Sequence, residues 1–394
     1  MVPHRVARSM ERLIELEAPL LRFFTESTFA RIDHADPRTC DLVAGNPQEM
    51  ALPQFVEALS RWTVPRDPQW FAYKFNEPYA REAVVRGLRE RRGVEVRRND
   101  VFMTDGAFTG LNLCIRTVTD PGDEVIFCSP PWFFYEALIV ASGATPVRVR
   151  VDEETWDLDV GAIEAAITDR TRAIIVNSPN NPTGRIYPPE TLERLAGVLT
   201  AATERNGRPV YLVSDEAYSR IVFDDRPYTS PTEAYPYSFL VYTYGKQLLT
   251  PGERLGFVAL PPTMPDRDGM HGPMTLAQLA IGGQGVPGAV LQRSLTELDP
   301  ITVDVKTLQG RRDRLVDALR SFGYEVHAPE GTFYLVPTCP DVDDVAFCER
   351  LGAEKVYVLP GSLVELPGRF RISVTASDEM IERSIPVFEA AARG

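Results

Sequence analysis

The chain has 394 residues, of which 44% are hydrophobic and 25% charged, so it is long enough for a large core and a second lobe. This balance excludes a disordered or fibrous protein. The formal net charge of −13 argues against a nucleic acid or an anionic membrane surface as a partner, because both bind basic surfaces. The first residues lack the apolar core of a signal peptide, and no apolar run approaches membrane-spanning length. We therefore expect a soluble, cytoplasmic protein.

The cysteines and histidines indicate neither disulfides nor a metal site. The five cysteines are odd in number, scattered and without the spacing of metal ligands, which favours free thiols in a reducing compartment. The four histidines are too dispersed for a zinc site, so we expect no bound metal. The cysteines are Cys40, Cys114, Cys128, Cys339 and Cys348.

The amino-terminal region should contain a helix at about residues 8–25 and pack on the second lobe. From about residue 100, short β-branched runs alternate with segments of helical length, such as 109–118, 135–141 and 189–205. This alternation predicts βαβ units and an α/β fold with a mainly parallel, seven-stranded sheet flanked by helices. The expected strands are 101–104, 124–128, 146–151, 173–177, 210–215, 239–244 and 254–260.

The pattern changes after the pair of prolines at 261 and 262. A long helical region at about 276–322 leads into short strands at 323–327, 333–336 and 370–374, and then into a closing helix at 377–392. This order is typical of a smaller α+β domain. We therefore expect a large, cofactor-binding domain at 53–265, and a small domain formed by 266–394 together with the amino-terminal arm, 1–52.

Lys246 is one of only four lysines in a chain that takes most of its positive charge from arginine. It follows an apolar, strand-like run at 238–242, and unlike arginine it can lose a proton and attack a carbonyl. Arg254, further along the chain, can hold a phosphate through two parallel hydrogen bonds. A reactive amine near a phosphate-binding arginine is what a Schiff base of pyridoxal phosphate requires. For a lysine considered alone, a surface position at a strand end would be the commoner explanation.

Two further motifs lie where neighbouring strands are expected to end. The run NSPNNPTG at 177–184 directly follows an apolar strand, at the sheet edge where open α/β folds bind ligands. The next strand ends at Asp215, which could pair with a ring nitrogen, and Tyr218 could reach a phenolic oxygen of the same ring. A lone aspartate here would more often cap a helix. Asp215, Asn181 and Lys246 at three neighbouring strand ends are hard to ascribe to capping.

The order of these motifs resembles that of the fold-type-I pyridoxal-phosphate enzymes, specifically the class I/II aminotransferases of the aspartate aminotransferase superfamily. The resemblance covers nearly the whole chain, through VAGNP at 43–47, TDGA at 104–107, SPPW at 129–132 and FRIS at 370–373. It implies pyridoxal 5'-phosphate as the cofactor and an amino acid and a 2-oxo acid as substrates. It also implies a homodimer whose active sites are shared between subunits.

The resemblance assigns roles around the cofactor ring. Lys246 forms the Schiff base and, once freed by substrate, shuttles the proton removed from the substrate Cα. Asp215 keeps the pyridine nitrogen protonated by charge pairing. Tyr218 and Asn181 contact the phenolic oxygen, and Trp132 stacks on the ring. By itself, Trp132 would be read as a core aromatic.

The resemblance also assigns the groups that bind the substrate and the phosphate. Arg371 grips the α-carboxylate with help from Asn181 and the Gly45 backbone, which orients the Cα–H bond for cleavage. By itself, Arg371 would be read as a surface arginine on an edge strand. The phosphate is held by the backbone amides of Gly106, Ala107 and Phe108 at a helix start, and by the side chains of Thr243 and Arg254.

The chain departs from the usual pattern of this family in several places. Gly245 and Phe108 stand where hydroxyl or polar phosphate ligands are frequent. Tyr73 resembles the tyrosine that reaches the phosphate of the partner subunit, although Phe75 could be the matching position. No arginine that would read a dicarboxylate side chain is identifiable, so the sequence does not support aspartate specificity. The aromatic run at 132–135 could line a pocket for a large side chain or belong to the core.

We therefore predict an aminotransferase that exchanges an amino group between an amino acid and a 2-oxo acid. The alternative is a lyase, cyclase or oxidative deaminase with the same cofactor, possibly in secondary metabolism, because these reactions share the carbanion formed when the Cα–H bond breaks. A cofactor-binding regulator is disfavoured because Lys246 is intact. A nicotinamide dehydrogenase is disfavoured because no Gly-x-Gly-x-x-Gly motif follows a strand.

Overall fold

The computed structural model describes residues 6–281, 283, 285–341 and 343–393, and its main feature is a central sheet. The strands of this sheet are β2 (Val101–Thr104), β3 (Glu124–Ser129), β4 (Thr145–Arg150), β5 (Thr171–Asn177), β6 (Tyr211–Asp215), β7 (Ser238–Thr243) and β8 (Gly256–Ala259). Within the described residues the order is β2-β8-β7-β6-β5-β3-β4. β8 runs antiparallel to both of its neighbours, and the other pairs are parallel. The predicted seven-stranded, mainly parallel sheet is confirmed.

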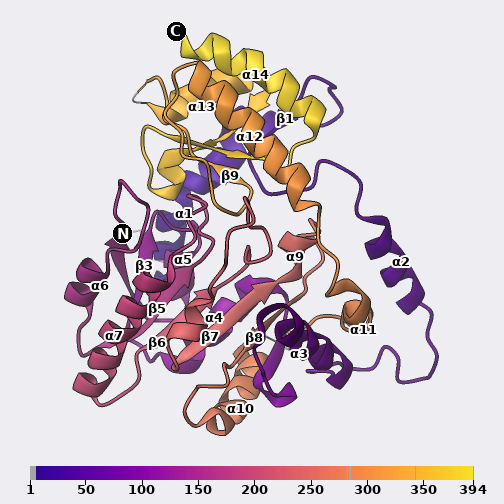
Figure 1. Cartoon of the computed structure of the whole chain (residues 1–394), viewed down its shortest axis with the longest axis vertical. Coiled ribbons are helices and arrows are strands. Elements are labelled where there is room, and N and C mark those ends of the chain that lie inside the picture. Colours follow the sequence, from indigo (N-terminus) through magenta and orange to yellow (C-terminus); the bar gives the residue numbers. More distant parts are fainter. Residues whose placement is uncertain (1–5, 282, 284, 342, 394) are drawn as a thin grey trace.

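The strands are apolar on both faces because helices cover both sides of the sheet (Figure 1). Within β5, Ile174 and Ile175 point to opposite sides and belong to different hydrophobic clusters. One cluster includes α6 and α7, and the other includes α4 and α5. The helices that follow the strands are α4 (Gly106–Val118), α5 (Tyr135–Ala141), α6 (Val160–Ala166), α7 (Pro189–Asn206), α8 (Pro231–Ala234) and α9 (Tyr244–Gln247).

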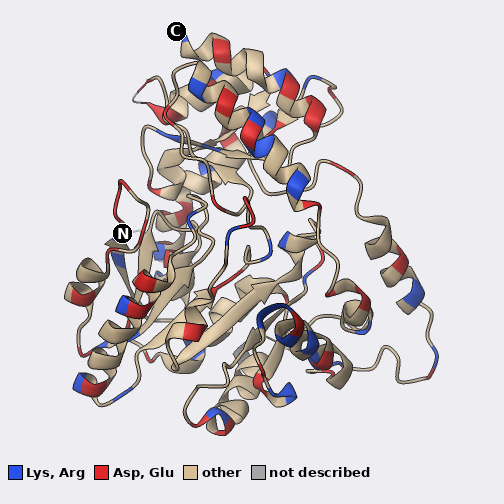
Figure 2. Ribbon diagram, in the orientation of Figure 1, with Lys and Arg blue, Asp and Glu red and all other residues tan. Residues whose placement is uncertain are grey.

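A smaller lobe lies above the central sheet in Figure 1. Its antiparallel sheet has the order β11-β12-β9, and β1 pairs in parallel with β10. Arg311 and Arg314 of one helix form ion pairs with Asp378 of another, and Figure 2 shows positive and negative residues interspersed along both. The elements are β1 (Cys40–Asp41), β9 (Tyr334–Leu335), β10 (Val356–Tyr357), β11 (Leu359–Pro360), β12 (Phe370–Ser373), α12 (Val305–Ser321), α13 (Asp344–Ala353), the 3-10 turn η4 (Gly361–Val364) and α14 (Asp378–Ala392).

The amino-terminal segment contacts both parts of the molecule. Its helix packs against α5, beside the central sheet. The backbone amide of Thr28 donates hydrogen bonds to Glu349 in α13 of the smaller lobe. No helix in the described ranges is long and apolar enough to cross a membrane. The remaining elements are α1 (Arg8–Glu26), η1 (Phe29–Arg31), α2 (Pro53–Trp62), α3 (Pro78–Arg92), η2 (Arg98–Asp100), α10 (Arg267–Leu276) and α11 (Ala289–Leu298).

Two of the predicted elements were wrong. The helical region expected at 276–322 is divided, because α10 passes into a π turn at Ala277–Ile281 and α11 ends at Leu298, just before Pro300, which has no N–H to continue a helix. The segment 323–327 is not a strand. The Glu325 carbonyl accepts a hydrogen bond from the amide of Thr338, and the Val326 carbonyl accepts from the Arg320 side chain. These bonds form no continuous ladder with a neighbouring strand.

Candidate active site

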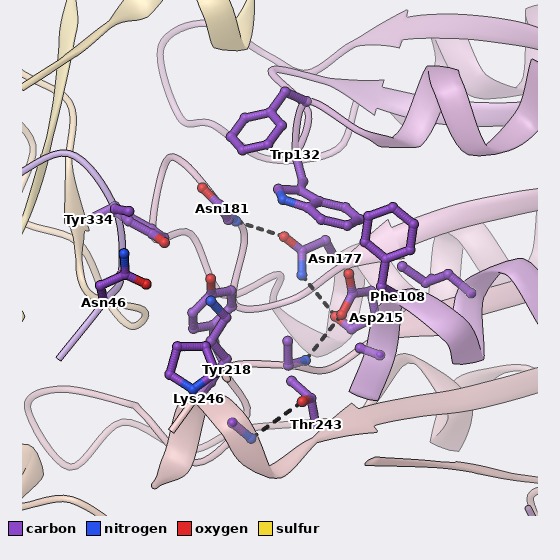
Figure 3. Close-up of a pocket in the computed structure, with 18 of the residues that line it drawn as sticks. Asn46, Phe108, Trp132, Asn177, Asn181, Asp215, Tyr218, Thr243, Lys246 and Tyr334 are labelled. Atoms are coloured by element: carbon purple, nitrogen blue, oxygen red, sulfur yellow. Dashed lines mark hydrogen bonds between the residues drawn. The ribbon is translucent and has the colours of Figure 1, made fainter. Parts of the chain in front are cut away.

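A cavity of about 280 Å³ lies at the carboxyl ends of the central strands, facing the smaller lobe. Figure 3 shows Lys246, Asp215 and Tyr218 on its floor, with Trp132 and Phe108 on one side and Asn46 and Tyr334 on another. The position agrees with the rule that open α/β sheets bind ligands at this edge. The predicted site residues that line the cavity are Gly45, Ala107, Phe108, Trp132, Asn181, Asp215, Tyr218, Thr243, Lys246, Arg254 and Arg371.

Lys246 lies in α9, the single turn that directly follows β7. Its Nζ is 5.7 Å from the ring centroid of Tyr218 and 5.9 Å from that of Phe333. The aromatic faces bound one side of the amine and leave it open toward the cavity that it lines. A lysine in this place can reach a carbonyl group of a bound molecule.

Asp215 ends β6 and is buried. Its Oδ2 accepts a 2.6 Å hydrogen bond from the hydroxyl of Tyr135, and its Oδ1 accepts one from the Ala217 amide at 3.2 Å. Burial raises the pKa of the Asp215 carboxyl, while the bond from Tyr135 acts in the opposite direction. A buried carboxylate with so little hydration favours a positively charged partner such as a protonated ring nitrogen. Tyr135 is not among the site residues predicted from the sequence.

Arg371 in β12 is buried and connects the smaller lobe to the sheet. Its Nη1 donates to Asn181 Oδ1 at 3.1 Å and its Nη2 to the Val43 carbonyl at 3.0 Å. Its Nε has no hydrogen-bond partner within the described part of the chain. Burial lowers the pKa of this guanidinium. No carboxylate neutralises Arg371 in these contacts, so it can bind the carboxylate of a small ligand.

The amide side chains of Asn177 and Asn181 link Arg371 to the end of β6. Asn177 donates to the Asp215 carbonyl at 2.9 Å, and its Oδ1 accepts from the Asn181 backbone amide at 2.7 Å, as Figure 3 shows. Asn181 Oδ1 in turn accepts from Arg371. The loop 177–184 thus holds Arg371 and Asp215 in a fixed relation across the cavity.

Tyr334 is a further residue of the site that the sequence analysis missed. It is buried, lines the cavity, and its ring centroid is 4.1 Å from Cζ of Arg371. Burial opposes ionisation of its phenol, but the charges of Lys246 and Arg371, together with Tyr218 and the Gly45 backbone, lower its pKa. Tyr334 pairs with Ser373 across the β9–β12 ladder, two residues from Arg371 on the same strand face. This register, which the sequence does not reveal, places Tyr334 beside Arg371.

The first residues of α4, Gly106, Ala107 and Phe108, lie beside Arg254 and form a concave surface that we call the cup. Gly106 has φ +77°, and a Cβ added to it would lie 2.7 Å from Arg254 Nη2. A Cβ on Gly256 would lie 2.8 Å from Gly106 Cα, so neither position has room for a side chain. Arg254 donates to the Asp105 carbonyl at 3.2 Å, and Thr243 lines the same part of the cavity. Helix amides, a guanidinium and a hydroxyl are the donors that a phosphate dianion requires.

These groups fit pyridoxal 5'-phosphate. Asp215 can face its ring nitrogen, Trp132 offers an aromatic surface to its ring, Lys246 is an amine for its aldehyde, and the cup beside Arg254 suits its phosphate. Gly106 and Gly256 let the backbone of this segment lie close to Arg254 and to itself.

Tyr73 does not line the cavity. It is 84% exposed, and Phe75 is also exposed. The prediction for Tyr73 concerned the site of a partner subunit, so its position in a single chain neither supports nor opposes that role.

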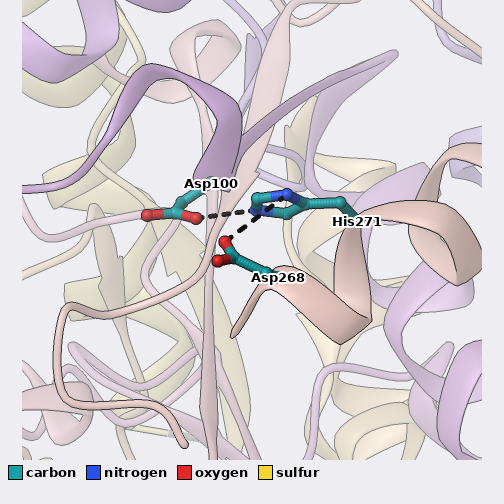
Figure 4. A group of neighbouring side chains, drawn as sticks. All are labelled: Asp100, Asp268 and His271. Atoms are coloured by element: carbon teal, nitrogen blue, oxygen red, sulfur yellow. Dashed lines mark hydrogen bonds and ion pairs between the residues drawn. The ribbon is translucent and has the colours of Figure 1, made fainter. Parts of the chain in front are cut away.

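A separate cluster of possible metal ligands lies at the far end of β2 and consists of Asp100, Asp268 and His271 (Figure 4). His271 Nε2 lies 2.8 Å from Asp100 Oδ1. Arg97 and Arg267 also bind Asp100, at 2.9 Å and 3.1 Å. Burial disfavours the charge of Asp100, but the hydrogen bonds from Arg97 and His271 outweigh it and lower the pKa. Two guanidinium groups already neutralise this carboxylate, so we interpret the cluster as an ion-pair network that fastens α10 to η2.

Comparison with known proteins identifies the family. Residues 40–387 match the family model "Aminotransferase class I and II". The aspartate/prephenate aminotransferase of Thermus thermophilus is 30% identical over 356 residues, which cover 88% of this chain and 89% of that protein. The aspartate aminotransferase of Thermotoga maritima is 29% identical over 362 residues, covering 89% and 90%.

Solved structures agree in fold over nearly the whole chain. An aminotransferase from Eubacterium rectale superposes with a TM-score of 0.87 at 28% identity, covering 99% of both chains. The aspartate aminotransferase of Thermus thermophilus with maleate gives a TM-score of 0.81 at 26% identity, covering 98% of this chain and 100% of that one. The chain therefore belongs to the class I and II aminotransferases, which use pyridoxal 5'-phosphate to move an amino group between an amino acid and a 2-oxo acid.

Proposed function

We propose that this aminotransferase works through Lys246 as the covalent attachment point of the cofactor and Arg371 as the clamp for the substrate carboxylate. One observation carries the proposal: Lys246, Asp215 and Arg371 come from three different elements, α9, β6 and β12, and line one cavity. A reactive amine, a buried acid and a carboxylate-binding guanidinium are the three groups that amino-group transfer needs from the protein.

Pyridoxal 5'-phosphate, when bound, carries the amino group between the substrates and withdraws electrons from the substrate Cα. Asp215 keeps the ring nitrogen protonated, because the buried carboxylate gains an opposite charge only in that form. Tyr218 and Asn181 would bind the phenolic oxygen, and Trp132 would offer its aromatic surface to the ring. The amides of Gly106, Ala107 and Phe108 hold the phosphate together with the side chains of Thr243 and Arg254.

Arg371 holds the substrate α-carboxylate while Asn181 and the Gly45 backbone fix its orientation. This orientation matters because the Cα–H bond breaks readily only when it stands perpendicular to the electron-withdrawing ring. The Lys246 amine would then take the proton from the substrate Cα and deliver it to the cofactor carbon that carried the aldehyde group. Both the amino acid and the 2-oxo acid carry the carboxylate that Arg371 binds, so one site serves both substrates.

The active enzyme is proposed to be a homodimer in which Tyr73 of one subunit reaches the phosphate of the other. Val64, Phe71, Tyr73 and Phe75 are all exposed, and such a run of apolar side chains on one surface segment suits a subunit interface. The segment follows α2, which stands at the edge of the molecule in Figure 1.

Subunit mixing tests the shared site. Lys246→Ala and Tyr73→Phe proteins, each impaired as a homodimer, should regain activity when mixed and allowed to exchange subunits, because a hybrid dimer contains one site with both native residues. Sedimentation of the native protein should show a dimer. A fully active monomer, or no recovery on mixing, would reject the shared site.

The attachment at Lys246 is tested by reduction with borohydride and mass spectrometry of the peptides. The proposal expects the cofactor mass on the peptide that contains Lys246, and no such adduct in Lys246→Ala. Lys306→Ala serves as the control, because Lys306 lies in α12 outside the cavity. An adduct on any other lysine of the native protein would contradict the assignment.

A further inference from the structure

Positive charge within the cavity is limited. Among the described residues that line it, the cations are Lys246, Arg254 and Arg371. In the proposed function all three have partners: the cofactor aldehyde, its phosphate and the substrate α-carboxylate. No lining cation is then left for a second carboxylate on the substrate side chain. Asn46, a neutral polar residue of the lining, lies beside Tyr334 in Figure 3.

Aromatic rings occupy the wall where a substrate side chain would lie. The Phe133 ring centroid is 6.0 Å from Cζ of Arg371, so this ring is next to the place where the α-carboxylate binds. Trp132 continues the wall, with its ring centroid 6.1 Å from Phe133 and 5.1 Å from Phe108. All three residues line the cavity and remain partly exposed.

Phe134 supports this wall from behind. Its ring centroid is 4.8 Å from that of Phe133 and 5.4 Å from those of Phe108 and Trp132, but it does not line the cavity. These ring contacts hold the wall in place. The open faces of Phe133 and Phe108 therefore present an apolar surface that a ligand can cover.

Charged and apolar substrate side chains should differ strongly in their free energy of binding against this aromatic wall. A carboxylate placed against it would lose its hydration without gaining a cationic partner. An aromatic or large aliphatic side chain would release water from apolar surface on both sides of the contact. The relatives from Thermus thermophilus and Thermotoga maritima are called aspartate/prephenate and aspartate aminotransferases. Among the described residues of this chain, the cavity lining holds no further cation for such a side chain.

We propose that this aminotransferase prefers amino acids with a large uncharged side chain, aromatic above all, and discriminates against aspartate and glutamate, with Phe133 and Phe108 as the residues that determine this preference. This inference rests on the proposed function of the same site. It concerns the side chain alone, and the binding of the α-carboxylate by Arg371 does not depend on it.

Binding of substrate-like acids to the cofactor-loaded enzyme tests the preference without turnover. The 3-phenylpropionate and succinate anions both offer a carboxylate to Arg371, and they differ in carrying a phenyl ring or a second carboxylate. Calorimetry should give a dissociation constant at least about tenfold lower for 3-phenylpropionate. Equal affinities, or tighter binding of succinate, would overturn the proposal.

A second test measures kcat/KM of the first half-reaction with alanine, phenylalanine and aspartate as amino donors. The kcat/KM for phenylalanine should exceed that for aspartate by at least about tenfold. In Phe133→Ala, the ratio of kcat/KM for phenylalanine to that for alanine should fall severalfold. Phe134→Ala is the matched control, since it removes a ring of the same cluster that does not face the ligand, and should change this ratio much less.

The outcomes separate this inference from the proposed function. Conversion of alanine together with a preference for aspartate would leave the function intact and overturn the side-chain preference, because a cation from the partner subunit would then have to complete the pocket. Conversion of none of the three amino acids would overturn the proposed function itself. An unchanged ratio in Phe133→Ala would show that the wall does not contact the substrate.

Discussion

The hydroxyl of Tyr135 donates a 2.6 Å hydrogen bond to Oδ2 of Asp215 at the bottom of the active-site cavity. Both side chains are buried, and they come from α5 and β6. The bond favours the charged form of a carboxyl whose pKa is raised by burial. Tyr135 is therefore expected to act through Asp215, as the residue that positions it and keeps it ionised.

Tyr135→Phe should lower kcat by about 10- to 100-fold, because a hydrogen bond to a charged group contributes about 1.5–3 kcal/mol. Without the donor, the pKa of Asp215 should rise further, and the acid side of the kcat profile should move to higher pH. Measuring kcat from acid to alkaline pH checks both effects. A profile with unchanged shape and height would show that Tyr135 only fills space.

Asp215→Asn should change how the stability of the cofactor-free protein depends on pH. Burial raises the pKa of Asp215 in the folded chain, so this group binds its proton more tightly when folded than when unfolded. The contribution of Asp215 to the free energy of unfolding therefore falls as the pH rises from the pKa of an ordinary aspartate to the raised pKa of the folded state. The Asp215→Asn variant has no carboxyl at this position, so it should not lose stability in this way as the pH rises. Urea unfolding of the native protein and of Asp215→Asn across that pH range tests this expectation. An equal loss of unfolding free energy in both proteins would contradict it.

Arg371→Ala should slow both half-reactions, because the amino acid and the 2-oxo acid use the same carboxylate clamp. Loss of a buried, bidentate contact should cost about 3–5 kcal/mol in transition-state stabilisation. Arg371→Lys keeps the positive charge but cannot donate two parallel hydrogen bonds to a carboxylate, so it should recover only part of the rate. Single-turnover measurements of each half-reaction check this. Impairment of only one of them would mean that another residue holds the second carboxylate.

Much of the fold follows from local sequence, because the parallel strands are continuous apolar runs between helices. The strand predicted at 101–104 and the helix predicted at 135–141 have the same bounds in the structure as β2 and α5. The division of the region 276–322 was missed, although Pro300 and the glycines near 283 mark breaks in the helical pattern. The strand expected at 323–327 failed because a β-prone run also needs a neighbouring strand with free backbone groups.

The site could be predicted where its residues directly follow strands, as with Lys246 and Asp215, because parallel strands bring their carboxyl ends together. Tyr135 and Tyr334 could not be found in this way. The bond from Tyr135 joins residues 80 positions apart, and Tyr334 depends on the register between β9 and β12. Both relationships are set by packing between elements, which the sequence pattern does not specify.

Amino-group transfer in two separate steps is tested most directly by single-turnover spectroscopy of the cofactor-loaded enzyme. An amino acid added alone should convert the absorbance of the bound cofactor to that of its amino form, with one equivalent of 2-oxo acid released per site and no ammonia. A 2-oxo acid added afterwards should restore the first spectrum, and Lys246→Ala should complete neither change at a useful rate. Spontaneous recovery of the first spectrum with release of ammonia, before any 2-oxo acid is added, would contradict the account and indicate an elimination or deamination reaction instead.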